Sequence, residues 1–288
     1  MKWEGNRESD NVEDRRGSGG GFGLSGGKLG IGSIVIAVVA SFFFGVSPMT
    51  VLNILGGGSN GVAVQQGSAP APPATDHLAK FVSVVLADTE DTWSELLRAR
   101  GATYTRPKLD LFTGGITTAC GTGESATGPF YCPADQKIYI DLSFYKVMQE
   151  RFHASGEFAQ AYVIAHEVGH HVQNLLGISD KVERARHNAS ATQANAMSVR
   201  LELQADCFAG VWAFHANRAR SILEQGDVEA ALNAASAIGD DALQRQSQGH
   251  VVPDSFTHGT SAQRVRWFNR GIESGQVDAC NTFETKQL

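Results

Sequence analysis

Residues 165–173, AHEVGHHVQ, place three histidines and one glutamate within six consecutive positions. His166 and His170 are four residues apart, and on an α-helix this spacing changes the direction of a side chain by only about 40°. Two imidazoles in this arrangement can bind one metal ion. Glu167 is rotated by about 100° from His166, so its carboxylate would lie beside the ion and could accept a proton from water. The spacing therefore predicts metal-assisted hydrolysis.

The flanks of this motif favour a binding site over a structural helix that happens to be rich in histidine. Residues 162–165 and Val168 are apolar or aromatic, which predicts a buried helix. Burying histidines and a glutamate in a core is costly unless something binds them. His171 is five residues from His166 and points in a different direction, so we expect it to contact a ligand or solvent rather than the metal.

A catalytic zinc site normally has three protein ligands and one open position, so a third ligand is required. One extended form of the motif needs glycine at position 173 and histidine at position 176, but this chain has Gln173 and Leu176. The later segment RLELQADCFAG offers Glu202 and Asp206, which share one helix face. We expect Glu202 to ligate the metal and Asp206 to accept the free imidazole N–H of a ligand histidine. The alternative is that both acids face solvent, and their apolar neighbours argue against it.

The length and charge of the chain limit the possible classes of protein. The chain has 288 residues and a net charge of −6, which suits one domain with appendages. A nucleic-acid-binding protein would need a basic patch, which an acidic balance does not favour.

The cysteine count also bears on the compartment. The four cysteines contain no CxxC pair, so two disulfides in an exported domain are favoured over zinc-thiolate ligation. The favoured pairing joins Cys120 to Cys132 and Cys207 to Cys280, although the sequence permits three pairings.

The composition of the N-terminal quarter predicts a membrane anchor. Residues 1–28 are polar and glycine-rich and are expected to form a disordered cytoplasmic tail. Leu29–Leu55 is apolar throughout and longer than the about 20 residues that span a bilayer, so we expect one transmembrane helix in contact with lipid. Residues 56–75 form a Gly/Pro/Ala-rich linker, and the folded domain is expected over 76–288.

The basic residues predict the orientation of this anchor. Those of the N-terminal region all precede the span, so we expect the N-terminus inside and the domain outside the cytoplasmic membrane, in the periplasm or its equivalent. A cleaved signal peptide is the alternative.

The remaining pattern predicts an α+β domain dominated by helices, with a small sheet. Strands are expected within residues 108–121 and 128–145. Helices are expected over 76–100, with Thr75 as the cap, from 156 or 157 to 176 with Ser155 as the cap, over 191–223, over 228–238 with a short piece to 246, and from a Thr260–Gln263 capping box to 273.

Four segments in this order, AHEVGHHVQ, ELQADCFAG, AIGDDALQ and FTHGTSAQRVRWF, resemble the bacterial membrane-anchored neutral zinc metallopeptidase family. The resemblance extends over essentially the whole chain. It implies a gluzincin-like, zincin-like catalytic domain that cleaves a peptide or protein substrate. It also implies that His166, His170 and Glu202 bind one Zn²⁺ per chain, with Glu167 as the general base.

Two further features are candidates for parts of the site. His258, in the turn before the last helix, could donate to the oxyanion of the transition state, and it could equally be a structural turn histidine. The strand around Tyr139–Leu142 could be an edge that pairs with an extended peptide.

Two other functions remain open at this point. One is a non-catalytic scaffold at the membrane that keeps a structural zinc on a protease fold. The other is a zinc hydrolase of a non-peptide amide.

Overall fold

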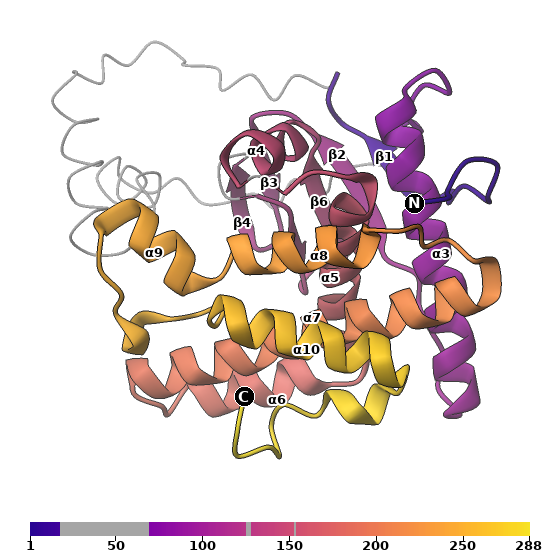
Figure 1. The fold of residues 1–288 in the computed structure, drawn as a ribbon. Coiled ribbons are helices and arrows are strands. Elements are labelled where there is room, and N and C mark those ends of the chain that lie inside the picture. Colours follow the sequence, from indigo (N-terminus) through magenta and orange to yellow (C-terminus); the bar gives the residue numbers. More distant parts are fainter. Residues whose placement is uncertain (18–68, 125–127, 153) are drawn as a thin grey trace, which may run out of the picture. The chain divides into compact units, whose positions relative to one another are not determined.

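The computed structural model of the chain describes residues 1–17, 69–124, 128–152 and 154–288, and these fall in one compact unit (Figure 1). The expected transmembrane anchor, Leu29–Leu55, and most of the expected linker lie outside the described residues. Within the described ranges, no helix is both long enough and apolar enough to cross a membrane.

The described residues form a helix-rich α+β unit, as predicted. The α-helices are α3 (His77–Ala99), α4 (Ser143–Arg151), α5 (Glu157–Leu175), α6 (Ile178–Arg186), α7 (Ala191–Arg220), α8 (Asp227–Ala237), α9 (Asp240–Gln248) and α10 (Ser261–Ser274), with short 3-10 turns η2 (Pro253–Ser255) and η3 (Val277–Cys280). The strands are β1 (Val12–Asp14), β2 (Lys108–Phe112), β3 (Gly115–Thr118), β4 (Gly121–Glu124), β5 (Phe130–Cys132) and β6 (Lys137–Asp141).

The main sheet has the strand order β1-β2-β6-β5, in which the first three strands are parallel and β5 is antiparallel to β6. The expectation that the strand around Tyr139–Leu142 forms an edge is wrong. Tyr139 lies on β6, which pairs with β2 on one side and with β5 on the other, so its backbone groups are already used. The alternation of side chains predicts a strand but carries no information on its place in the sheet, and the edges are β1 and β5.

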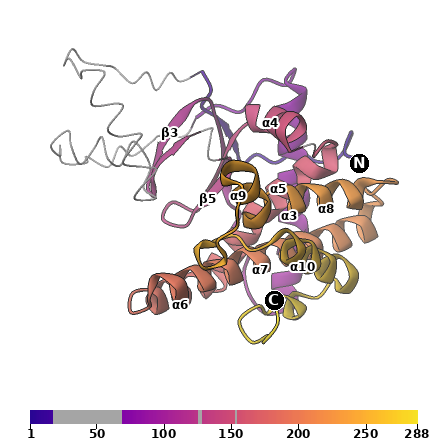
Figure 2. The ribbon, with the colours of Figure 1, turned by 60° about the vertical axis from the view of Figure 1, so that its left-hand side comes forward.

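Helix α7 packs against α5 and against α10, and α5 also contacts strands β5 and β6 of the sheet (Figures 1 and 2). Small residues allow this close approach. A Cβ atom added to Gly169 of α5 would lie 3.0 Å from the Cα atom of Ala205 in α7. A Cβ atom at Gly271 of α10 would lie 2.0 Å from the carbonyl oxygen of Cys207, so only glycine fits where α7 and α10 cross. Helix α7 is therefore held between α5 and α10.

Two disulfides, Cys120–Cys132 and Cys207–Cys280, connect the cysteines in the expected pairing. The first ties the end of the β3–β4 turn to β5. The second ties α7 to η3, beyond α10. Each therefore restrains an element next to the helices that carry the histidine and glutamate motifs.

The expectation of a disordered tail over residues 1–28 is wrong for residues 1–17. Trp3 is buried and its ring packs edge-on against Phe81 of α3. Strand β1 adds to the sheet, with Val12 opposite Leu109. The folded unit accordingly includes this segment, in addition to the expected domain that begins at 76.

The charges of this segment explain why its composition was misleading. The guanidinium of Arg16 lies 2.7 Å from a carboxylate oxygen of Asp76, and Arg15 lies 2.7 Å from Asp110. Charges that look solvated in the sequence are paired with carboxylates far along the chain. Sequence composition does not reveal such partners.

Helix boundaries follow the expected ones closely, with different caps at two helices. Helix α3 is capped by Asp76, whose side chain accepts from the backbone N–H of Ala79, instead of Thr75. Gly156 precedes α5 without a side-chain cap, so Ser155 is not its cap. The capping box of Thr260 and Gln263 begins α10 as predicted.

Candidate metal centre

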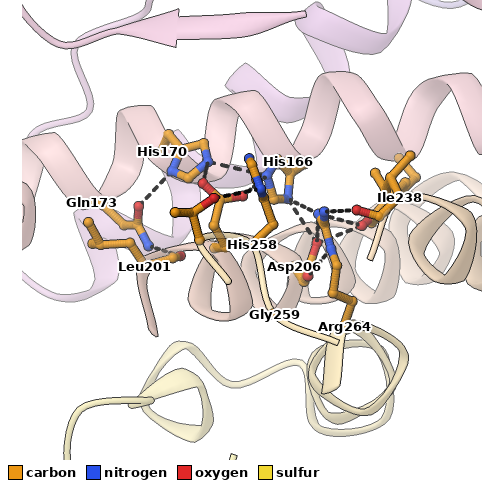
Figure 3. Close-up of polar contacts among 12 residues, drawn as sticks. His166, His170, Gln173, Leu201, Asp206, Ile238, His258, Gly259 and Arg264 are labelled. Atoms are coloured by element: carbon orange, nitrogen blue, oxygen red, sulfur yellow. Dashed lines mark hydrogen bonds and ion pairs between the residues drawn. The ribbon is translucent and has the colours of Figure 1, made fainter. Parts of the chain in front are cut away.

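Three side chains from two helices meet in one place (Figure 3). His166 and His170 project from α5, and their Nε2 atoms are 3.2 Å apart. Glu202 of α7 places one carboxylate oxygen 3.2 Å from Nε2 of His166 and the other 3.4 Å from Nε2 of His170. Within the described part of the chain, these three residues form the group of acidic, histidine or cysteine side chains placed to hold a metal ion.

The hydrogen bonds on the far side of each ring show what faces the centre. Nδ1 of His166 lies 2.8 Å from a carboxylate oxygen of Asp206, and Nδ1 of His170 lies 2.9 Å from the amide oxygen of Gln173. Both Nδ1 atoms therefore donate, and in the neutral rings both Nε2 atoms present lone pairs. Two lone pairs and a carboxylate this close repel one another unless a cation lies between them.

The spacing suits zinc. Ligand bonds of about 2.0–2.1 Å in a tetrahedral arrangement separate the ligand atoms by roughly 3.3 Å. The observed separations of 3.2 Å and 3.4 Å match this value. Two imidazoles and one carboxylate also form the donor set of known catalytic zinc sites.

The electrostatics of the centre favour positive charge. Burial opposes a charge on His166, but Asp206 and Glu202 outweigh burial and raise the pKa of His166 to about 10. The pKa of His170 is also raised, because Glu202 outweighs burial there. The two histidines hold the pKa of Glu202 well below its usual value despite burial. Positive charge is therefore stabilised where the three side chains meet.

Glu167 lies on α5 directly after the first histidine and lines the same cavity as the three candidate ligands. Its side chain is largely buried, and burial raises the pKa of its carboxyl group above the usual value. A carboxylate with a raised pKa is a better proton acceptor than an exposed one. The position and the environment both suit a general base.

His258 lines this cavity from the loop before α10. Its Nδ1 atom lies 3.1 Å from Asp240, whose other carboxylate oxygen accepts from the backbone N–H groups of Thr257, His258 and Gly259. The hydrogen bond to Asp240 raises the pKa of His258. Asp240 thus holds the loop and the ring together, and Nε2 of His258 remains available to a bound molecule.

His171 does not belong to the group of candidate ligands, but the expectation that it contacts a ligand or solvent is wrong. It is buried, with Nδ1 3.0 Å from the hydroxyl of Tyr131 and Nε2 2.6 Å from the backbone oxygen of Thr105. The sequence reading did not identify Tyr162, Gln173 or Arg264 as parts of the site. Periodicity could have indicated the first two, since they lie four residues before His166 and three after His170, on the same helix face.

The centre opens into a cavity of about 1110 Å³. Its walls combine the candidate ligands with a broad apolar and aromatic surface, to which β5, α4, α5, α6 and α7 contribute; the apolar part includes Phe130, Tyr131, Phe144, Val147, Val163, Val182 and Leu201. A cavity of this volume exceeds the range of about 300–1,000 Å³ typical of small-molecule sites.

These observations define the class of the protein: an α+β domain in which two histidines and one glutamate, placed to hold a metal ion, line a large cleft. A sequence profile of the family described as "Putative neutral zinc metallopeptidase" matches residues 1–283. The chain belongs to this family. The matched range includes the N-terminal segment that carries β1.

Relatives extend over most or all of the chain. The Escherichia coli K12 protein named "Uncharacterized protein YpfJ" is 54% identical over 290 residues, covering 98% of this chain and 99% of the relative. The Mycobacterium tuberculosis H37Rv protein named "Uncharacterized protein Rv2575" is 42% identical over 206 residues, covering 68% of this chain and 67% of the relative. No solved structure matches the chain.

Proposed function

We propose that this protein is a zinc-dependent peptidase that hydrolyses peptide bonds in protein or peptide substrates. The observation that carries the proposal is the convergence of His166, His170 and Glu202, with both Nδ1 atoms committed to acceptors. A zinc ion bound there would polarise a carbonyl and lower the pKa of a bound water.

The chain's own residues supply the rest of the reaction. The carboxylate of Glu167 accepts the proton from the attacking water and returns it to the leaving amine. Nε2 of His258 can donate to the oxygen that becomes negative in the transition state. The apolar walls of the cleft receive substrate side chains and exclude water.

Strand β5 provides a means of holding an extended peptide. It is one of the two edges of the main sheet, and Phe130 and Tyr131 on it line the cleft. A peptide paired with β5 would have its backbone aligned beside the metal centre. We assign this role to β5 and not to β6, because β6 is paired with another strand on each side.

A non-catalytic zinc scaffold is the second candidate, since the three metal ligands would serve it equally well. A scaffold has no use for a buried carboxylate beside the centre, and Glu167 is 7% exposed. Peptidase activity explains that residue and the cleft together.

Replacing Glu167 with glutamine tests catalysis separately from metal binding. Glu167→Gln is expected to lower cleavage of an unfolded protein by about 10²–10⁴-fold, because the proton acceptor is lost. Zinc content should stay at one equivalent, measured by elemental analysis. Glu229→Gln, an exposed position on α8, is the matched control and should cleave normally. Unchanged cleavage in Glu167→Gln would contradict the mechanism, and a zinc-loaded wild type inert toward many unfolded substrates would favour the scaffold.

We also propose that the domain acts outside the cytoplasmic membrane and that residues 29–55 contact lipid. Two disulfides support an oxidising compartment. The N-terminus is on the same side of the membrane as the domain in this proposal, and not in the cytoplasm as the sequence predicted. A folded unit cannot be divided between two compartments, and residues 1–17 pack into the same unit as the cleft. The proposal therefore puts residues 1–17 on the side of the domain.

A further inference from the structure

One arginine is buried directly behind the metal centre. Arg264 lies in the second turn of α10, and its side chain is 3% exposed. Its Nε atom donates to one carboxylate oxygen of Asp206 at 2.9 Å, and its Nη2 atom donates to the other at 2.8 Å. Nη2 also lies 3.2 Å from the hydroxyl of Tyr162. Figure 3 shows the guanidinium and Asp206 next to His166.

The arginine meets the centre through Asp206 and also directly, since its Nη2 atom lies 3.4 Å from Nδ1 of His166. Asp206 is completely buried, and its Oδ1 atom accepts from Nδ1 of His166 at 2.8 Å and from the hydroxyl of Tyr162 at 2.5 Å. A buried carboxylate with only a neutral imidazole and a hydroxyl as partners would be costly. The two parallel bonds from Arg264 supply the compensating charge and determine the plane of the carboxylate.

Helix packing alone does not require this ion pair. Helices α7 and α10 are already in backbone contact at Gly271, and the Cys207–Cys280 disulfide joins α7 to the segment after α10. The guanidinium is aimed at the carboxylate that accepts from Nδ1 of a candidate ligand. Holding the Asp206 carboxylate in a fixed orientation explains the position of the guanidinium.

The two candidate ligand histidines are supported in different ways. Nδ1 of His170 donates to the neutral amide of Gln173, which is itself held by the backbone oxygen of Leu201 and by Gln204. Nδ1 of His166 donates to the charged carboxylate of Asp206, which is in turn held by Arg264 of α10. Only His166 is therefore sensitive to a change on α10.

We propose that Arg264 is a positioning residue of the metal centre: by holding both oxygens of Asp206, it keeps the ring of His166 turned so that Nε2 faces His170 and Glu202. This inference rests on the proposed function, in which these three side chains bind zinc. Arg264 lines the cavity, and the role proposed for it is exerted on His166 through Asp206 rather than on substrate or metal.

The test compares zinc affinities, measured by competition with a chelating indicator, in the full chain and its variants. Arg264→Met is expected to weaken zinc binding by about 10–100-fold, as is usual for residues that orient a metal ligand. Arg264→Lys keeps the positive charge but lacks the two parallel N–H donors of the guanidinium, so it should weaken zinc binding by a smaller but measurable factor. Arg270→Met, an exposed position on the same helix, is the matched control and should bind zinc as the wild type does.

A double variant distinguishes positioning from a general loss of stability. If Arg264 acts through Asp206, Arg264→Met should add no more than about twofold to the effect of Asp206→Asn. Independent effects that multiply, or a lowered melting temperature with unchanged zinc affinity, would overturn the proposal. If Arg264→Met does not fold, wild-type affinity in Arg264→Lys would overturn it. A wild type that binds no zinc would instead refute the proposed function.

Discussion

At the scale of single residues, the roles of His166, His170 and Glu202 depend on spacing that can be read directly from the sequence. Four-residue spacing on one helix predicts that two histidines share a face, and the structure has their Nε2 atoms 3.2 Å apart. The meeting of Glu202 with them required a second helix to lie alongside, which spacing alone does not establish. The expectation for Glu202 came from the need for a third ligand and from the apolar flanks of its segment, and the resemblance to a family implied the same residue.

Other parts of the site could not be predicted residue by residue. Arg264 lies 98 positions after His166, and its contacts depend on how α10 crosses α7. Asp240 is 18 positions before His258 and connects to it through a loop. Sequence patterns report neighbours on the same element, whereas these pairs form only when elements pack.

His258 allows a prediction at this scale. His258→Ala is expected to lower turnover by about 10²–10³-fold, because a donor to the developing oxyanion is lost, while zinc content stays unchanged. The measurement is steady-state cleavage with zinc analysis on the same sample. His250→Ala, an exposed histidine in the preceding loop, is the control and should have normal turnover. Unchanged turnover in His258→Ala would remove this residue from the mechanism.

At the scale of elements, helices were more predictable than strands. The Thr260–Gln263 capping box and the apolar spacing predicted the bounds of α10 closely. Glycine at position 177 marks the end of α5. Strand β6 was recognised by its alternation, but its central position was not, because strand order depends on pairing partners. Strand β1 was missed, since it has only three residues and two of them, Glu13 and Asp14, are charged.

The packing of strand β1 into the folded unit leads to a prediction about the side of the membrane on which residues 1–17 lie. Asp10 and Asn188 are both exposed, and all four cysteines are in disulfides, so a cysteine at either position is a unique label site. In cells with an intact cytoplasmic membrane, a membrane-impermeant maleimide is expected to label Asp10→Cys and Asn188→Cys equally, because both belong to one folded unit outside.

The alternatives give distinct results in the same experiment. Labelling of Asn188→Cys before lysis and of Asp10→Cys only after lysis would refute the shared compartment of residues 1–17 and the domain. Labelling of both only after lysis would refute the extracytoplasmic location. Labelling of both before lysis would support the proposal.

At the scale of the whole molecule, the helices and the two disulfides serve one arrangement. Helix α5 carries the two candidate ligand histidines and Glu167, α7 carries Glu202 and Asp206, and α10 carries Arg264. Close glycine contacts hold these helices at the distance that the centre needs. Strand β5, at one edge of the sheet, contributes Phe130 and Tyr131 to the wall of the cleft.

The most direct measurement is anomalous X-ray scattering at the zinc edge from crystals of the zinc-loaded protein. The account predicts one zinc per chain, at about 2.0–2.1 Å from Nε2 of His166, Nε2 of His170 and a carboxylate oxygen of Glu202. A Glu202 carboxylate turned away from both imidazoles, with no other protein oxygen or nitrogen in its place, would contradict it.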